Sequence, residues 1–233
     1  HIAMNTLTKP RYLSTGATAS TRWTGTTYPI AVPQGGQRAL ARGWLWLGLL
    51  ALIGSGLFSL LLVLSRTPVI NQWLPGVDFF RVALVVHVDL SVLVWFASLA
   101  GMLWSLNNTP RGTAWGWFAL AGCAAGAVLM ALSAFVGRGA PVMANYIPVL
   151  ERPLFMLGLV VFALASAVLV GHSLWAAPRT GLSIDGSGAL RFGFNAAAVS
   201  AAVALGAFAW SFAVVPTTLD GKAYYEILFW GGG

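Results

Sequence analysis

Long apolar runs separated by short polar segments make up most of this chain of 233 residues. A helix that crosses the hydrocarbon core of a bilayer needs about 20 largely apolar residues. Five runs reach that length, and charged residues, asparagine or proline stand close to their ends. The five predicted spanning helices are Trp44–Leu64, Val82–Leu106, Ala114–Val136, Leu154–Ala177 and Phe192–Val215.

A sixth apolar run begins at Ala223 and continues to the last residue, Gly233. As a helix it would rise about 16 Å, roughly half of the hydrocarbon core. Because a helix that ends in lipid leaves carbonyl groups without partners, we expect the natural chain to continue or another chain to complete this helix. The predicted fold class is an all-α membrane protein with five complete transmembrane helices and the start of a sixth, in a domain of residues 44–233 truncated in helix six.

Composition agrees with lipid as the main solvent of this chain. Hydrophobic residues make up 58% of it and charged residues only 8%, whereas a soluble domain carries about 25% charged residues. Residues 1–43 are rich in Thr, Ser, Gly and Pro and lack the apolar core of a signal peptide. We therefore expect a flexible, basic N-terminal tail, with Met4 as the natural start and residues 1–3 as an added remnant.

The charge of +7 is read as a membrane-orientation signal rather than as a nucleic-acid surface, because the basic residues stand between apolar runs. Cytoplasmic segments of membrane proteins carry an excess of Lys and Arg. With the amino terminus in the cytoplasm, the inner segments hold more basic residues than the outer ones. The inner residues are Lys9, Arg11, Arg22, Arg38, Arg42, Arg111, Arg179 and Arg191, and the outer ones are Arg66, Arg81, Arg138, Arg152 and Lys222.

His87 is the most informative ionisable residue inside a predicted helix, where such residues are costly and indicate function. It lies about 12 Å from the outer end of its helix. No second metal ligand stands three or four residues further on, which excludes a zinc pair on one helix. Two interpretations remain open from position alone: a hydrogen bond to a neighbouring helix, or ligation of haem iron, whose other ligands the porphyrin supplies.

His172 and Asp89 are the next candidates. His172 lies about 28 Å from the outer end of its helix, so one haem cannot bridge it and His87, and we interpret it as an interfacial residue. Asp89 follows His87 by two residues and therefore lies about 200° around the helix from it. Asp89 either packs with hydrogen bonds, orients a neighbour, takes part in proton movement or pairs with an arginine of another helix.

Other motifs in the chain favour packing or a solvated surface. Cys123 is the single cysteine and is expected to pack in the interior. Gly122 and Gly126 form a small-xxx-small pattern, which predicts a close helix contact. Glu226 belongs to a polar cluster near the outer surface that could simply be a solvated helix entry. The other members of that cluster are Asp220, Lys222, Tyr224 and Tyr225.

Three segments together resemble subunit I of the haem–copper oxidase (cytochrome c oxidase) family. Residues 79–96, FFRVALVVHVDLSVLVWF, resemble its second helix, in which one histidine in the outer third is an axial ligand of low-spin haem. Residues 224–233, YYEILFWGGG, resemble the start of its sixth helix, where a Leu-Phe-Trp stretch leads to a copper-binding histidine. Residues 145–155, NYIPVLERPLF, resemble the connection into its fourth helix. The resemblance covers nearly all of the chain after residue 40.

The resemblance implies the N-terminal half of a twelve-helix catalytic subunit. In it His87 would ligate a low-spin haem of b or a type, and Arg81 and Arg152 would hold the haem propionates. The high-spin haem and the copper are expected only from residues beyond Gly233, so these 233 residues are expected to be inactive alone. The implied reaction is reduction of dioxygen to water with electrons from cytochrome c or quinol. The implied setting is a bacterial inner membrane, with other oxidase subunits as partners.

Two alternatives remain. Gly231 and Gly232 stand where the usual oxidase form has other aromatic residues, which is similar to divergent members such as nitric oxide reductases. The alternative from another class is a non-catalytic membrane anchor or transport subunit without a cofactor.

Overall fold

The computed structural model describes residues 32–74, 78–145, 147–180, 186–216, 218–219 and 221–230. The predicted tail up to residue 31, Asp220 and the closing residues 231–233 lie outside these ranges. Five helical stretches are long and apolar enough to cross a membrane, which confirms the membrane-spanning character predicted from the apolar runs. They are α1 (Gly36–Leu64), the continuous stretch Phe79–Asn107, α4 (Thr113–Leu132), α5 (Pro153–Ala176) and α6 (Ser187–Val214).

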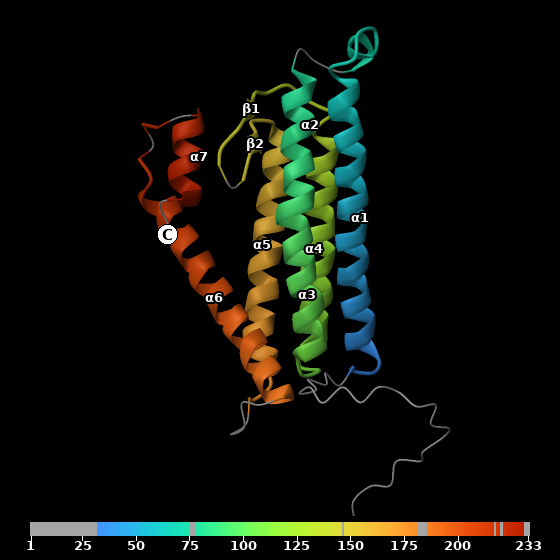
Figure 1. The fold of residues 1–233 in the computed structure, drawn as a ribbon. Coiled ribbons are helices and arrows are strands. Elements are labelled where there is room, and N and C mark those ends of the chain that lie inside the picture. The colour runs from blue at the N-terminus through green and yellow to red at the C-terminus, as the bar shows by residue number, and fades with distance from the viewer. Residues whose placement is uncertain are drawn as a thin grey trace, which may run out of the picture.

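The first four of these stretches form a bundle (Figure 1), in which they run side by side along most of their length. One end of the bundle carries the amino terminus of α1 and the connection from the stretch Phe79–Asn107 to α4. The other carries a 3-10 turn, η1 (Ile70–Trp73), and a short β-hairpin. We call the latter the hairpin end. Many large apolar side chains point out of the bundle, including Leu57, Leu60 and Val63 on α1, as expected for helices in lipid.

Helix α1 begins at Gly36, eight residues before the predicted start at Trp44; the boundary between tail and membrane domain at residue 43 stays a prediction. Leu40, at 1% exposure, and Trp44, at 0%, are both buried. The Leu40 side chain fills the space beside Gly116 of α4, where a Cβ atom would collide with it. The extra turns of α1 therefore pack on α4. This could not be predicted from the sequence, because the polar residues of this segment interrupt the apolar run.

The second spanning stretch is not a uniform α-helix. It consists of α2 (Phe79–Val88), a π-helical segment η2 (Asp89–Val94) and α3 (Trp95–Asn107). A π-helical segment is rare, and when present it often marks a functional site. This one begins two residues after His87.

The fold is not entirely helical. Strands β1 (Pro141–Val142) and β2 (Val149–Leu150) pair antiparallel between α4 and α5, so the all-α prediction is wrong for this connection. Gly139, at φ 159°, leads into it, and a Cβ atom there would collide with the carbonyl of Glu151. The close approach of these two backbones brings the chain from α4 back to the start of α5.

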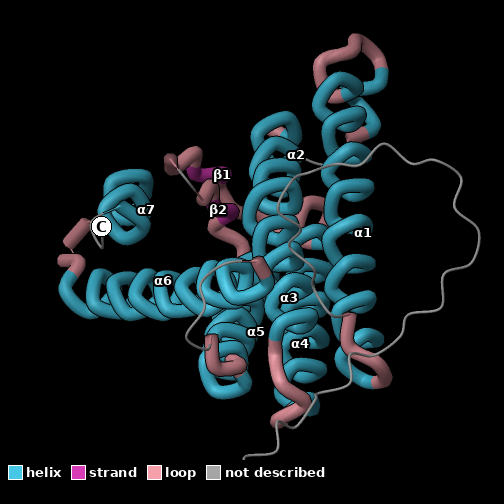
Figure 2. Tube along the Cα trace, turned by 60° about the horizontal axis from the view of Figure 1, so that its bottom comes forward, coloured by secondary structure: helices cyan, strands magenta, loops and turns pink. Residues whose placement is uncertain are grey.

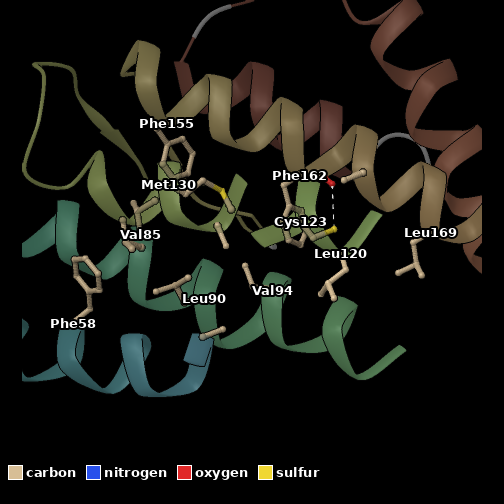
Figure 3. Close-up of a cluster of buried hydrophobic side chains, with 14 of the residues drawn as sticks. Phe58, Val85, Leu90, Val94, Leu120, Cys123, Met130, Phe155, Phe162 and Leu169 are labelled. Carbon is tan, nitrogen blue, oxygen red and sulfur yellow. Dashed lines mark hydrogen bonds between the residues drawn. The ribbon is translucent and has the colours of Figure 1, made fainter. Parts of the chain in front are cut away.

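Helices α4 and α5 pack closely through small residues, as the glycine pattern predicted. A Cβ atom on Gly126 would lie 2.7 Å from the carbonyl oxygen of Gly158, and one on Gly122 would lie 2.7 Å from the Cβ of Ala165. Cys123 between them is fully buried, 4.0 Å from the carbonyl of Phe162. Figure 3 shows it among the buried side chains, which confirms its packing role.

Helix α6 starts against the bundle and then leans away from it, as both Figure 1 and Figure 2 show. Within its described residues only Ala198 and Ser211 are buried. Helix α7 (Gly221–Trp230) returns beside the far end of α6. It contains residues 223–230, the described part of the sixth apolar run.

Candidate functional site

His87 lies on α2 at the contact with α1, about 12 Å from the first residue of its helix. Its Nδ1 atom is 2.9 Å from both the carbonyl oxygen and the hydroxyl oxygen of Ser55 on α1. The Ser55 hydroxyl in turn donates to the carbonyl oxygen of His87 at 3.0 Å. Ser55 is only 3% exposed, so this reciprocal pair is buried between the two helices.

The two partners of Nδ1 favour different tautomers of the imidazole. The Ser55 carbonyl oxygen only accepts hydrogen bonds, so the contact with it is a hydrogen bond in the tautomer that protonates Nδ1, whereas the Ser55 hydroxyl can bond to Nδ1 in either tautomer. In the neutral imidazole with Nδ1 protonated, the other nitrogen, Nε2, holds a free lone pair. Among the described residues Nε2 has no hydrogen-bond partner, and it is not one of the sealed polar atoms of the interior.

This arrangement matches the usual state of a metal-binding histidine. Such a residue donates its second ring N–H to a carbonyl or carboxylate, which fixes the ring and raises the basicity of the ligating nitrogen. The hydrogen bond that we considered as the alternative to haem is therefore present, but it uses only one ring nitrogen. The two interpretations of His87 are compatible.

The surroundings of His87 form a half-buried apolar strip on the second spanning stretch. Leu84, Val88, Ser91 and Trp95 are each half-buried, like His87 itself. Ser91 donates to the carbonyl of His87 at 2.8 Å, so its hydroxyl faces the backbone.

Asp89 occupies the first position of η2 and is 1% exposed. Its Oδ2 atom has no hydrogen-bond partner within the described part of the chain. The ion pairs of that part do not include Asp89, so the predicted pairing with an arginine is not found there. The hydrogen-bonded packing interpretation therefore has no support at Oδ2. Asp89 is a buried carboxyl group on the opposite side of the helix from His87.

His172 lies at the opposite end of the bundle from His87 and does not contribute to this site. It is 7% exposed, and its Nε2 atom is 3.0 Å from the carbonyl of Arg111 in the connection between α3 and α4. The role of His172 is thus to hold that connection against α5. This position agrees with the interpretation of an interfacial residue made from its depth.

The two arginines expected at haem propionates lie at the hairpin end, but neither is next to His87. Arg81 is exposed and pairs with Asp78 at 3.5 Å. Arg152 is buried, and its Nη1 atom donates to the carbonyls at the end of α4, with the Ala134 oxygen 3.1 Å away. Their assignment to propionates stays a prediction.

Two polar contacts could not be anticipated from the residues alone. Ser55 stands between Gly54 and Gly56 in an apolar helix, and a polar residue at such a position is the one signal that could have indicated it. Glu226 on α7 accepts from Asn145 at 3.1 Å and pairs with Lys222 at 3.3 Å. The predicted polar cluster near α7 therefore connects this helix to the segment between β1 and β2.

A search for groups of three or more His, Cys, Asp or Glu side chains that could hold a metal finds none among the described residues. His87 is thus a single candidate ligand.

Comparison with known proteins gives relatives but no family. No family model matches this chain, and no solved structure matches it. An uncharacterized protein of Rickettsia prowazekii is 26% identical over 226 residues, which cover 84% of this chain and 43% of the relative. An uncharacterized protein of Aquifex aeolicus is 24% identical over 190 residues, which cover 82% of this chain and 47% of the relative. The chain therefore spans less than half the length of each of these curated relatives.

Proposed function

We propose that this chain is the N-terminal part of a respiratory oxidase subunit and that His87 supplies one axial ligand to a low-spin haem. The observation that carries the proposal is the difference between the two ring nitrogens of His87. Nδ1 is held by Ser55, while Nε2 has no hydrogen-bond partner in the described chain; with Nδ1 as the donor to the Ser55 carbonyl, Nε2 would keep the lone pair that an iron needs. The resemblance of residues 79–96 to the second helix of haem–copper oxidases supports the same assignment.

When bound, the haem would supply an iron that accepts and passes on single electrons. The residues of this chain would fix its geometry. His87 would hold the iron from one side, and Ser55 would keep the ring from rotating and keep Nδ1 protonated. The apolar strip around His87 would exclude water from the iron, and burial and ligation are what tune the potential of a haem.

The second axial ligand is assigned to a residue outside the described chain, because His172 is at the wrong depth and already occupied by Arg111. The haem–copper centre that reduces dioxygen to water is, in this proposal, formed by residues outside the described chain. In this proposal the hairpin end lies on the side of the membrane away from the cytoplasm, and the amino terminus lies in the cytoplasm, in keeping with the distribution of basic residues.

The test is a reduced-minus-oxidised optical spectrum of the full-length protein. We expect the parent protein to show a haem α-band. In His87→Ala we expect the part of this band that comes from the low-spin haem to disappear. His172→Ala is the matched control, since it removes a buried histidine that makes a backbone hydrogen bond without contacting the proposed site. A pigment-free protein would instead support the anchor or transport alternative. Equal spectra of the two variants and the parent would also refute the assignment of His87.

Turnover assays separate the two redox candidates. Oxygen consumption with reduced cytochrome c or quinol supports the oxidase. Consumption of nitric oxide with little oxygen uptake would support a reductase of the same family, the alternative suggested by Gly231 and Gly232 in the sequence.

A further inference from the structure

A pocket of about 650 Å³ opens at the hairpin end, between the start of α2, the turn that follows α4, and β1. Its apolar wall comes from Phe79, Val82 and Phe135, and its cationic groups are Arg138 and Arg152. It is distinct from the proposed haem site. Val82 precedes His87 by five residues, so the two side chains lie about 140° apart around the helix.

Arg152 is the unusual member of this pocket. It is 7% exposed, and the described residues offer it no carboxylate within ion-pair distance. Its Nη1 atom donates to backbone carbonyls of Ser133 and Ala134, but its Nε atom is sealed without a hydrogen-bond partner in the described structure. Burial lowers the pKa of Arg152 from its ordinary value. A buried cation of this kind is costly unless an anion accompanies it.

The rest of the pocket adds positive charge. Arg138 is exposed and stands between Gly137, at φ 91°, and Gly139, at φ 159°. Glycine adopts these backbone conformations readily, which lets the chain turn sharply on both sides of Arg138. Asp78 is the acidic residue of the lining, and it is already paired with Arg81. The lining therefore presents two guanidinium groups and no free carboxylate.

Apolar surface continues from the pocket onto the outside of the bundle. Phe135, which lines the pocket, is 49% exposed, and its neighbours Leu132 and Val136 are 50% and 56% exposed. A soluble anion would use only the arginines, whereas a lipid would use the arginines for its headgroup and these side chains for its acyl chains. Guanidinium groups bind phosphate through charge-assisted hydrogen bonds.

We propose that this pocket binds the phosphate of an anionic phospholipid headgroup at the membrane surface, with the acyl chains lying over the exposed end of α4. The proposal does not depend on the haem assignment. It differs from the propionate prediction for Arg152 in the ligand, and His87 is not part of the pocket lining.

The test measures how much phosphatidylglycerol the full-length protein retains in mild detergent, by native mass spectrometry and lipid phosphorus analysis. We expect about one tightly held molecule per protein, and about tenfold weaker retention in Arg138→Gln, as for the loss of one charged hydrogen bond. Arg152→Gln is expected to act in the same direction, but it also removes a cap of α4. The exposed Arg138 therefore gives the cleaner test. Arg66→Gln, on the same side of the membrane but outside the pocket, is the matched control and is expected to retain the lipid.

Four outcomes would overturn the proposal. One is retention that survives Arg138→Gln and Arg152→Gln, and another is an equal loss in Arg66→Gln. A third is an equal rise in the Tm of the delipidated protein with inorganic phosphate alone and with phosphatidylglycerol vesicles, which would identify a free anion as the ligand. The fourth is a shifted haem spectrum in Arg152→Gln with unchanged lipid retention, which would return the pocket to a propionate.

Discussion

The contact between α4 and α5 predicts opposite effects for the same substitution at two positions of one helix. A Cβ atom on Gly158 would lie 2.9 Å from the carbonyl oxygen of Gly126 and 2.9 Å from the backbone nitrogen of Met130. Neither of these backbone atoms can move without shifting α4. A Cβ atom on Gly171, also within α5, would meet nothing within 4 Å.

Both alanine variants gain the same helix propensity, of roughly 1 kcal/mol in soluble hosts. The difference between Gly158→Ala and Gly171→Ala therefore isolates the overpacking cost, which is typically about 1–3 kcal/mol. For a protein of this size, 1 kcal/mol changes the Tm by about 2–4 °C. We thus expect the Gly158 variant to melt roughly 2–12 °C below the Gly171 variant.

The assay is thermal unfolding of the two purified variants in the same detergent, followed by circular dichroism and by light scattering. A Gly158 variant as stable as the Gly171 variant would refute the reasoning. It would mean that the two helices can separate at no cost, and that the close approach of their backbones does not stabilise the bundle.

Three further predictions concern single contacts. Cys123 should react with a membrane-permeant maleimide only after denaturation, because it is fully buried between α4 and α5; fast labelling of the native protein, measured by mass shift, would contradict this. Glu226→Gln should lower the free energy of unfolding by less than about 1 kcal/mol, because its ion pair with Lys222 is at the surface. This corresponds to a fall in Tm of less than about 4 °C in thermal unfolding, and a fall several times larger would show that this pair is structural. Ser55→Ala removes the hydroxyl but leaves the carbonyl that accepts from Nδ1 of His87, so redox titration should show a haem that is retained with a displaced midpoint potential, whereas complete loss of the α-band would contradict the assigned tautomer.

The apolar runs were sufficient to predict five spanning helices, because a bilayer imposes one length on every segment that crosses it. The boundaries were less predictable where packing decides them. The start of α1 contains Arg38 and Arg42, which mark it as a tail by composition. Its Leu40 side chain nevertheless packs beside Gly116 of α4, and a contact between distant segments cannot be read from either one.

The candidate site shows the same division. His87 could be identified from its type and depth, since an ionisable residue in lipid requires a reason. Its tautomer could not, because it depends on Ser55, which is 32 residues away in the sequence. The short β-hairpin was missed for a related reason, as strands of two residues leave too little alternation to detect.

The π-helical segment η2 has a consequence for how this chain can be compared with others. Each widened turn accommodates extra backbone relative to an α-helix, so it acts as a local insertion and offsets the rotational phase of everything that follows. The Trp104 side chain, whose indole N–H donates to the carbonyl of Phe194 at 3.1 Å, depends on that offset to face α6. A homologue that lacked the widened turn would need a compensating deletion or a different residue to make this contact. Alignments through residues 89–94 should therefore place their gaps at η2 before any face of the helix is compared.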